Sequence, residues 1–428
     1  MRQNRVTDVE HAWFTPWDID HPVSGSPLRS YHLAGGVAAA LGMTVFSPVE
    51  ELASSSPYPP LAGRIDLRRH ERGTFGRLLG RTILNPTARA ARGPALDSFC
   101  RHLARRWSQG HEHWVVCDSA YLAPPLLRLA GATGARLIYC SHNCETDVWK
   151  QLVRAASSAT ARAGALLAYW EVRRQERALL RAASATWCCS SVDAGFMGTL
   201  APGSAGSIIV VPNGVNPEIV PVQRVDAIEP DTICFIGYLG AGPVHETCML
   251  LIDEVLPRIR AARPGARLLL AGRDARPQLR ARAGGGTEVI SPLADPAAVL
   301  RRARASVVPQ FQGGGTRIKI IESLAAGRPV VSTSKGAEGL LVDRLPGITI
   351  ADSVLELAST VVAELDRPLD QARADELRSH AVQIYSWDGI IRELASEMAT
   401  RFPGQWRRAA AVSAAAADRH PRTGDERR

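Results

Sequence analysis

Long apolar runs are missing from this chain of 428 residues. No stretch approaches the roughly 20 consecutive apolar residues of a membrane-spanning helix, so the sequence predicts no transmembrane segment. The first residues, MRQNRVTDVEHAW, also lack the apolar core of a signal peptide, which predicts a cytoplasmic protein. With 46% hydrophobic and 22% charged residues, the composition is that of a globular protein with room for two domains.

Metal-ligand spacings are also missing from the cysteines. The eight cysteines form no CxxC pair and no spacing typical of a zinc site. They are predicted to be small buried side chains in a reducing compartment, and no metal site is expected from them.

Lysine is scarce. Of the 51 lysine and arginine residues only three, Lys150, Lys319 and Lys335, are lysines. The net charge of +9 would suit an anionic partner. However, the general preference for arginine and alanine is typical of a GC-rich genome. The charge is therefore weak evidence for function.

The most informative stretch runs from residue 305 to residue 340. Its pattern predicts a strand at 306–311, a glycine loop at 313–315, a helix at 316–326 and a second strand at 329–333. In such a βαβ unit the first loop lies at the carboxyl edge of a parallel sheet, where α/β proteins bind phosphates.

The residues of this loop favour an anionic ligand. Gly313, Gly314 and Gly315 allow positive φ and close approach of a ligand to the N–H groups, and the helix that follows points its positive dipole end at the same place. Thr316 is the predicted N-cap. Arg317 and Lys319 then fall in the first turn, where cations oppose the dipole unless an anion lies nearby.

Glu322 lies three residues after Lys319 on the predicted helix. It could form an ordinary surface pair with that lysine, or it could accept both hydroxyls of a ribose. Next to a phosphate-binding loop, the second interpretation indicates a site for a nucleoside diphosphate.

The order of strands and helices predicts an α/β fold of two Rossmann-like doubly wound domains facing a cleft. The amino-terminal domain covers residues 1–213, with a basic insertion at 53–110, and the carboxy-terminal domain covers 214–384. A helix at 387–401, within the segment 385–408, is expected to pack back on the amino-terminal domain. The tail 409–428 is expected to be disordered.

Other loops at predicted strand or helix ends offer further candidates. Gly25 and Ser26 precede a helix at 28–41 and could present N–H groups to an anion, although an ordinary turn would look the same. His142 follows a predicted strand, where a lone histidine is more often a structural hydrogen-bonding group than a catalyst. Gly237 and Tyr238 follow another strand.

Two weaker patterns are ambiguous. Asp18 and Asp20 form a DxD triplet that could hold a divalent metal against a diphosphate, but such triplets are common by chance. The region from Arg64 to Arg106 contains eleven arginines. It could form a basic amphipathic helix on an anionic membrane surface or an acidic acceptor, or it could be a solvated face.

Taken together, these motifs resemble those of the retaining glycosyltransferases of the GT-B type, glycosyltransferase family 4. The stretch GGGTRIKIIESLAAGRPVVSTSKGAEGL is similar to the donor-site signature of that family almost letter for letter. The remaining similarities follow the order of the family along nearly the whole chain: an amino-terminal glycine loop at Ser24 to Leu33, an HNxE strand end at His142 to Glu145, a PNGVD-like turn at Pro212 to Asn216 and a first donor-domain strand at Phe235 to Gly237.

The resemblance implies a transferase that uses a UDP-, GDP- or dTDP-sugar and retains the anomeric configuration, without an obligatory metal or cofactor and without a nucleic-acid partner. The acceptor would be a carbohydrate, a lipid-linked molecule or a small molecule, as in polysaccharide, glycolipid or natural-product biosynthesis. By position, Glu322 would bind the ribose, and Arg317, Lys319 and the loop amides would neutralise the diphosphate. His142 would lie near the donor sugar. The other implied positions are Gly237 and Tyr238 for the donor, and Gly25, Ser26, Arg29, Asn143 and Glu145 for an acceptor or phosphate loop.

Two departures from the family pattern leave alternatives open. Gly314 stands where many members have a second glutamate, and no Arg–Lys pair follows the first donor-domain strand between Tyr238 and His245. The stretch from Gly313 to Glu322 must then supply most donor contacts. The alternatives are a sugar phosphorylase of the same architecture and a non-catalytic protein that binds nucleotide sugars.

Overall fold

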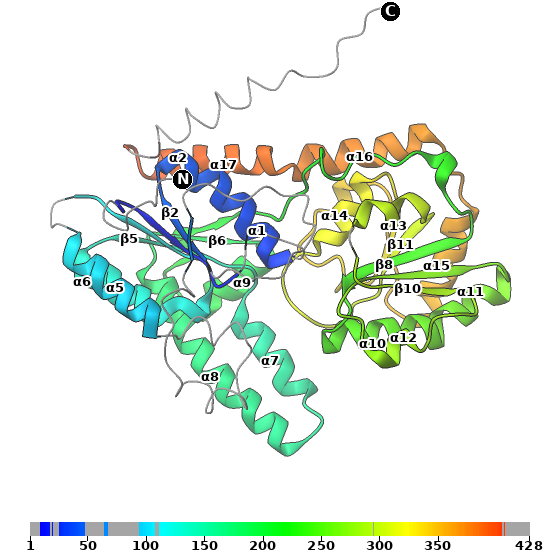
Figure 1. Cartoon of the computed structure of the whole chain (residues 1–428), viewed down its shortest axis with the longest axis horizontal. Coiled ribbons are helices and arrows are strands. Elements are labelled where there is room, and N and C mark those ends of the chain that lie inside the picture. Colours follow the sequence, from blue (N-terminus) through cyan, green and yellow to red (C-terminus); the bar gives the residue numbers. More distant parts are fainter. Residues whose placement is uncertain are drawn as a thin grey trace, which may run out of the picture. The chain divides into compact units, whose positions relative to one another are not determined.

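The computed structural model describes residues 9–17, 19, 25–47, 64–66, 94–107, 111–293, 295–404 and 406. It divides into two compact units (Figure 1). The N-terminal unit contains the described residues up to Val211 together with those from Trp387 onward, and the C-terminal unit contains Pro212–Ser386.

The N-terminal unit is built on a parallel sheet of seven strands in the order β3-β2-β1-β4-β5-β6-β7. From β1 the strands β2 and β3 are added toward one edge of the sheet, and from β4 the strands β5 to β7 are added toward the other edge. The β1–β4 pair is therefore the switch point of the sheet. The strands are β1 (Ala12–Phe14), β2 (Thr44–Ser47), β3 (Arg64–Asp66), β4 (Trp114–Cys117), β5 (Arg136–Cys140), β6 (Ala185–Cys188) and β7 (Ile208–Val210).

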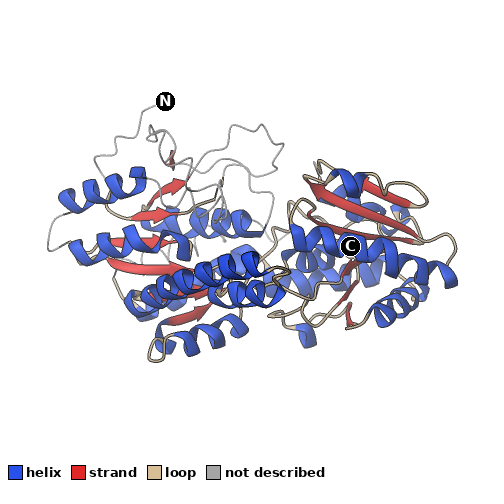
Figure 2. Cartoon of the chain, turned by 90° about the horizontal axis from the view of Figure 1, so that it is seen from below, coloured by secondary structure: helices blue, strands red, loops and turns tan. Residues whose placement is uncertain are grey.

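Helices cover both faces of this sheet (Figure 2). One face packs on α5, α6, α8 and α9, and the other on α1, its continuation and α17. The helices of the unit are α1 (Gly25–Leu33), the π-helical η2 (Ala34–Ala38), α2 (Ala39–Leu41), α5 (Pro94–Arg106), η4 (Ala120–Leu122), α6 (Ala123–Thr133), α7 (Glu145–Ala155), α8 (Ala159–Ala182), α9 (Ser191–Leu200), η5 (Ala205–Ser207) and α17 (Trp387–Arg401).

The last helix, α17, is part of the N-terminal core although it follows the C-terminal unit in sequence. Its apolar face contributes Trp387 and Leu394 to a cluster with Trp13 on β1. The approach is close at Gly36, where a Cβ atom would lie 2.7 Å from Ile391 Cδ1. A larger residue at position 36 would therefore push the two helices apart.

The C-terminal unit is built on a parallel sheet of six strands in the order β10-β9-β8-β11-β12-β13. Its switch point lies between β8 and β11. The strands are β8 (Thr232–Tyr238), β9 (Arg267–Arg273), β10 (Thr287–Ile290), β11 (Ala305–Val308), β12 (Val330–Ser332) and β13 (Ile348–Ile350). The helices are η6 (Val225–Ala227), α10 (Gly242–Leu250), the π-helical η7 (Leu251–Val255), α11 (Leu256–Ala262), α12 (Pro277–Arg280), α13 (Pro296–Arg302), α14 (Ile318–Ala325), η8 (Val342–Arg344), α15 (Val354–Asp366) and α16 (Gln371–Tyr385).

The predicted fold class, two doubly wound α/β domains, is confirmed. All eight cysteines are buried and none forms a disulfide. Within the described ranges no helix is both long and apolar enough to cross a bilayer. Asp18, Asp20, the basic residues 67–93 and the tail 409–428 lie outside the described residues.

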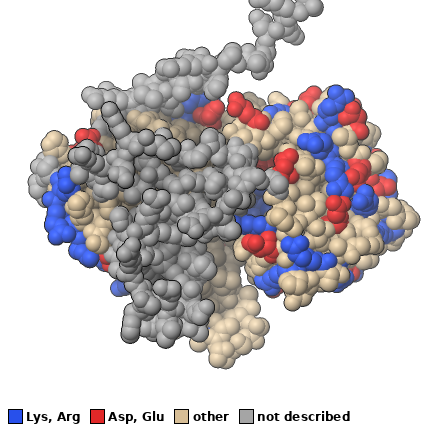
Figure 3. All heavy atoms as spheres, in the orientation of Figure 1, with Lys and Arg blue, Asp and Glu red and all other residues tan. Residues whose placement is uncertain are grey.

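Charges of both signs are interspersed over the visible face of the C-terminal unit (Figure 3). Many charged residues of this unit pair, as where Arg302 donates to both Glu229 and Glu288 at 2.6–2.9 Å. The basic residues seen there form no single-sign patch.

Candidate functional site

The glycine loop lies at the carboxyl edge of the parallel C-terminal sheet, as predicted, and follows β11 at the switch point of that sheet. β11 ends at Val308, and the chain runs through Gly313–Gly315 into α14, which begins at Ile318. Gly313 and Gly315 have φ values of 108° and 69°, in the region that favours glycine. The adjacent strand β8 brings Gly237 to the same edge of the sheet.

Thr316 is not the N-cap of this helix, so that prediction was wrong. The N-cap is Arg317, which makes no side-chain capping bond, and the helix begins at Ile318, two residues after the predicted start at 316. The Thr316 hydroxyl is instead buried and accepts a hydrogen bond of 2.8 Å from Asn213 Nδ2. Asn213 thereby fixes the end of the loop from a distant part of the sequence.

Arg317 folds back over the loop. Its guanidinium donates to the carbonyl oxygens of Gly315 at 2.9 Å and of Gln312 at 3.3 Å, and also to that of Gly314. These carbonyl groups point toward Arg317. The N–H groups of the same peptide units therefore point away from it and are not used by this side chain. The side chain therefore holds the loop in shape and adds a positive charge beside it.

The loop amides have the properties of an anion site. In the described part of the chain, the N–H groups of Gly314, Gly315 and Thr316 donate to no acceptor. The first-turn N–H groups of α14 add the positive end of the helix dipole. An anion placed here would satisfy several donors at once.

Lys319 extends from the first turn of α14 to the end of β8. Its Nζ lies 4.2 Å from the ring centroid of Phe235 and 3.0 Å from the place where a Cβ on Gly237 would be. No hydrogen bond or ion pair joins Nζ to a described residue. Burial, reinforced by the nearby charge of Arg317, lowers the pKa of Lys319 to about 7.

Glu322 lies one turn after Lys319, and its carboxylate also lacks a hydrogen-bond partner among the described residues. Burial raises the pKa of Glu322 to about 7, and the charge of Lys319 opposes this shift only in part. The alternative of a simple Lys–Glu surface pair is not observed, since no ion pair forms between the two side chains. Two unpaired ionisable groups at one sheet edge are characteristic of a ligand site.

Tyr238 and Gly237 end β8 beside this site. Tyr238 is 42% exposed, and the guanidinium of Arg273 lies 4.4 Å from its ring centroid. A second close approach involves Gly336 after β12, where a Cβ would lie 2.6 Å from the carbonyl oxygen of Val308. The site therefore depends on glycine at several strand ends.

In the N-terminal unit, His142 lies at the end of β5 and contacts Asp118 at the end of β4. His142 Nε2 is 2.9 Å from Asp118 Oδ1, and Trp17 Nε1 lies 3.3 Å from the same nitrogen. Nε2 cannot donate to the carboxylate and accept from Trp17 at once. Because the contact with the carboxylate is shorter and charge-assisted, we assign the proton to Nε2 and the lone pair to Nδ1.

Two buried acceptors at this edge have no partner among the described residues, His142 Nδ1 and Asn143 Oδ1. Buried polar atoms are usually hydrogen-bonded, so orphaned acceptors on neighbouring residues favour a ligand with donor groups. Hydroxyl groups would satisfy them.

Glu145 is the first residue of α7, and the N–H groups at this end of the helix are not available to a ligand. The first amides of α7 are already occupied, because Glu176 accepts from the N–H groups of Glu145 at 3.1 Å and Thr146 at 2.8 Å, and Asp193 from that of Cys144 at 3.1 Å. Glu145 itself accepts a hydrogen bond of 2.9 Å from Tyr121. Its burial, together with the nearby charge of Glu176, raises the pKa of Glu145 to about 7.

Gly25 and Ser26 form the first turn of α1. Arg29 on the same helix is fully buried, and its Nη1 donates a hydrogen bond of 2.7 Å to the carbonyl oxygen of Val211. This contact ties α1 to the strand-end segment after β7. It is the contact of a structural arginine rather than of one directed to solvent.

Asp118 and Trp17 were not among the predicted site residues, and Asn213 was identified only as part of the PNGVD-like turn. Asp118 directly follows the buried strand β4, and this position was the available signal. The contacts of Trp17 and Asn213 could not be predicted locally, because their partners lie 125 and 103 residues away.

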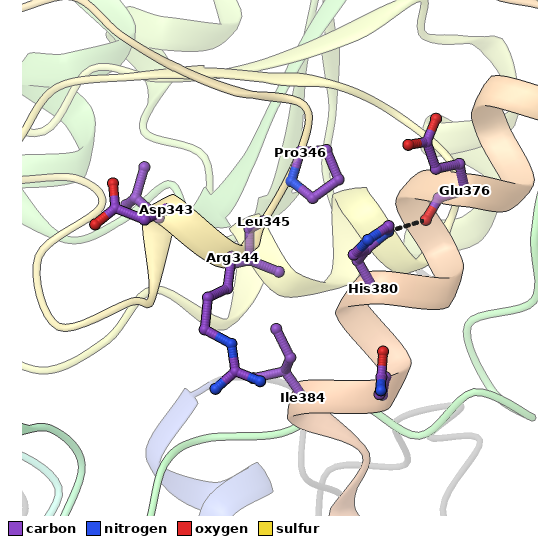
Figure 4. Close-up of a pocket in the computed structure, with 9 residues that line it drawn as sticks. Asp343, Arg344, Leu345, Pro346, Glu376, His380 and Ile384 are labelled. Atoms are coloured by element: carbon purple, nitrogen blue, oxygen red, sulfur yellow. Dashed lines mark hydrogen bonds between the residues drawn. The ribbon is translucent and has the colours of Figure 1, made fainter.

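A surface hollow of about 430 Å³ lies elsewhere in the C-terminal unit, between η8 and α16 (Figure 4). His380 lines it and donates from Nδ1 to the Glu376 carbonyl oxygen at 3.0 Å. None of the candidate donor-site residues lines this hollow. Its charges are of both signs, and it carries no functional assignment.

Comparisons with known proteins agree with the geometry of the C-terminal unit. Residues 230–367 match the family model described as Glycosyl transferases group 1. Phosphatidyl-myo-inositol mannosyltransferase from Mycobacterium leprae is 28% identical over 193 residues, which are 44% of this chain and 52% of that protein. The match thus spans about half the length of this relative.

Solved structures match nearly the whole chain. Sucrose-phosphate synthase from Thermosynechococcus elongatus has a TM-score of 0.65 at 16% identity and covers 92% of this chain and 99% of its own. Anabaena Alr3699/HepE in complex with UDP and glucose has a TM-score of 0.62 at 12% identity, with 92% and 100% covered. The trehalose-6-phosphate synthase OtsA has a TM-score of 0.61 at 12% identity, with 91% and 98% covered.

These likenesses define the protein first as a two-domain α/β chain of the GT-B fold. Within that fold, residues 230–367 match the family described as Glycosyl transferases group 1. The matched segment contains the glycine loop, Lys319 and Glu322.

Proposed function

We propose that the protein is a retaining glycosyltransferase that moves a sugar, such as a hexose, from a nucleotide-diphosphate sugar to an acceptor hydroxyl. The observation that carries the proposal is the arrangement around α14: loop amides without an acceptor, and a half-buried lysine and a half-buried carboxylate that pair with no described residue. Each is costly in the free protein and would be satisfied by one part of such a donor.

The diphosphate is assigned to the amides of Gly314, Gly315 and Thr316 and to Lys319. Cleavage at the anomeric carbon builds negative charge on the departing phosphate, and fixed N–H groups and a cation stabilise that charge without reorganising. Arg317 contributes through the loop that it holds and through its charge. Protonated Lys319 is favoured once the diphosphate is bound, because an anion raises the pKa of a neighbouring ammonium group.

The ribose is assigned to Glu322, whose two oxygens can accept hydrogen bonds from vicinal hydroxyls. Tyr238 and Gly237 complete the donor side at the end of β8. In this assignment Lys319 and the loop amides take the place of a resident metal at the diphosphate.

In the N-terminal unit we assign His142 to the reaction and Asn143 to binding. Their orphaned acceptors would take hydroxyl donors of a sugar. In our assignment Arg29 and Glu145 support this edge, because Arg29 is buried and Glu145 is engaged by Tyr121. UDP-sugars are the first donors to test, because UDP and glucose accompany the Anabaena structure that shares this fold.

The proposal is tested by thermal shift with a panel of UDP-, GDP- and dTDP-sugars, followed by transfer assays with the donor that stabilises the protein. Lys319→Ala and Glu322→Ala should each lower kcat/KM by about 10²-fold or more. Glu254→Ala, an exposed carboxylate on η7, is the matched control and should behave as wild type. Full activity in either site variant would refute the assignment.

A non-catalytic nucleotide-sugar-binding protein remains a defined outcome of the same test, since Gly314 occupies the position where many family members carry a second glutamate. Stabilisation by a donor without transfer or hydrolysis would support it. Phosphate-dependent breakdown of a disaccharide would instead support a sugar phosphorylase.

A further inference from the structure

The helices α7 and α8 form an antiparallel hairpin in the N-terminal unit, connected by Ala156–Ser158. Figure 1 shows them side by side, extending beyond the sheet. The base of the hairpin is anchored by buried Glu176 and Thr146. No residue between Thr146 and Ala168 is buried, so the outer half of the hairpin packs only weakly on the rest of the unit.

The outer half exposes large apolar side chains. Leu167 and Trp170 on α8 are 66% and 59% exposed, and Leu152 and Leu166 are each 39% exposed. A core helix would bury such residues, and a helix facing only water would not need them. Their grouping on one projecting element indicates a contact surface.

The charges around these side chains are mainly positive. Residues 148–170 contain three cations, Lys150, Arg154 and Arg162, and no aspartate or glutamate. Glu171 directly follows Trp170, and its carboxylate accepts a hydrogen bond from Gln175. Beyond Trp170, Arg174 is exposed, and the guanidinium of Arg173 lies 5.5 Å from the Trp170 ring centroid.

Apolar and cationic groups share one stripe along α8. Arg162, Leu166, Trp170 and Arg174 follow one another at intervals of four residues, so they lie on one side of the helix. Leu167 borders this stripe. The result is an apolar centre with a cation at each end, which is the pattern of a helix that rests in a membrane interface.

We propose that this stripe, with Arg162, Leu166, Leu167, Trp170 and Arg174, docks on an anionic lipid bilayer. Trp170 and the leucines would enter the region between headgroups and acyl chains, where tryptophan is favoured. The arginines would remain at the headgroups and gain from the negative surface potential. The proposal is independent of the sugar-transfer assignment, because it concerns neither candidate site.

A second copy of the chain is a poorer occupant of this surface. In a two-fold interface each patch meets its own kind, so the arginines of two copies would meet with only Glu171 of each copy to offset their charge. An acidic protein could neutralise the cations. However, projecting aromatic and aliphatic side chains flanked by arginines match the layered chemistry of a bilayer surface, with apolar material below the charge.

The test is flotation of the full chain with vesicles of phosphatidylcholine alone and of phosphatidylcholine mixed with phosphatidylglycerol. The wild type should float with the anionic vesicles and not with the neutral ones. The double variants Leu167→Ser/Trp170→Ser and Arg162→Gln/Arg174→Gln should each lower the apparent affinity about tenfold or more. Both remove exposed groups, and unfolding curves that superimpose on the wild type would show that the fold is kept.

The matched controls lie in the C-terminal unit. Leu355→Ser removes an apolar side chain that is 71% exposed, and Arg258→Gln removes an exposed arginine. Both should float as the wild type does. If the hairpin variants also float unchanged, or if no variant or wild type floats, the proposal fails. A wild-type dimer that the hairpin variants abolish would overturn the proposal in favour of a second copy of the chain. Loss of binding in the arginine variant alone would overturn it in favour of an acidic surface without an apolar layer.

Discussion

Asp118 Oδ1 and His142 Nε2 lie 2.9 Å apart at the carboxyl ends of two adjacent strands. Asp118 is fully buried, and its other oxygen accepts a hydrogen bond of 3.2 Å from Trp13 Nε1. The carboxylate is thus held from two sides. It fixes both the orientation of the imidazole and the nitrogen that carries its proton.

We predict that Asp118→Asn lowers kcat by about 10²-fold, with a smaller effect on the KM of the donor. The amide keeps the size of the side chain but removes the charge that selects the histidine tautomer. The measurement is steady-state transfer, compared with His142→Ala and with the double variant. If the aspartate acts through the histidine, the double variant should be no worse than His142→Ala; additive losses would contradict this.

A second prediction concerns Asn213, whose side chain holds Thr316 at the end of the donor loop. Asn213→Ala should lower the free energy of unfolding by about 1 kcal/mol and weaken nucleotide binding, because the loop amides lose their fixed positions. Urea unfolding and titration with UDP measure the two effects. Thr316→Val, which removes the acceptor hydroxyl at nearly constant volume, should reproduce both; wild-type nucleotide affinity in both variants would rule out an anchoring role.

The comparison of sequence and structure shows which features can be predicted. The helix α17 was predicted with its observed bounds, because its buried apolar residues recur at helical spacing. β1 was missed, since three residues buried on both faces show neither alternation nor a helical period.

The start of α14 shows a different limit. Threonine is a good N-cap by local rules, yet Thr316 bonds to Asn213, and the cap position moves to Arg317. The same limit applies to the histidine site. Its partner Asp118 is placed by the sheet register, which local sequence does not contain.

A third prediction concerns pH. The pKa of Glu322 rises from 4.5 to about 7 on folding, so its ionised form costs stability above pH 4.5, and the full cost is reached above pH 7. Glu322→Gln should therefore stabilise the free protein at pH 8, by on the order of 1 to 3 kcal/mol, and leave it unchanged near pH 4.5. Thermal unfolding across this range measures the difference, and equal effects at both ends would exclude a buried carboxylate.

The pKa shift of Lys319 is opposite in sign to that of Glu322. Its pKa falls from 10.5 to about 7, so the charged ammonium costs stability below pH 7, and this cost disappears above pH 10.5. Lys319→Met should thus stabilise the free protein most at low pH. In nucleotide binding, affinity should fall above pH 7 as Lys319 loses its proton and below pH 7 as Glu322 gains one. Each variant should flatten one limb of the profile.

The last prediction uses Gly237, which has no positive φ and could accept alanine on conformational grounds. Its Cβ would lie 3.0 Å from Lys319 Nζ and 3.3 Å from Val244 Cγ1, so the ammonium group would have to move from the end of β8. Gly237→Ala should therefore weaken UDP binding about tenfold or more, as Lys319→Ala does, while the thermal stability of the free protein changes little. Gly131→Ala on α6, where a Cβ meets nothing within 4 Å, is the matched control and should bind normally. In a Lys319→Ala background the added methyl group has no ammonium group to displace, so Gly237→Ala should cause no further loss of UDP affinity. A further loss would mean that Gly237 affects donor binding independently of Lys319.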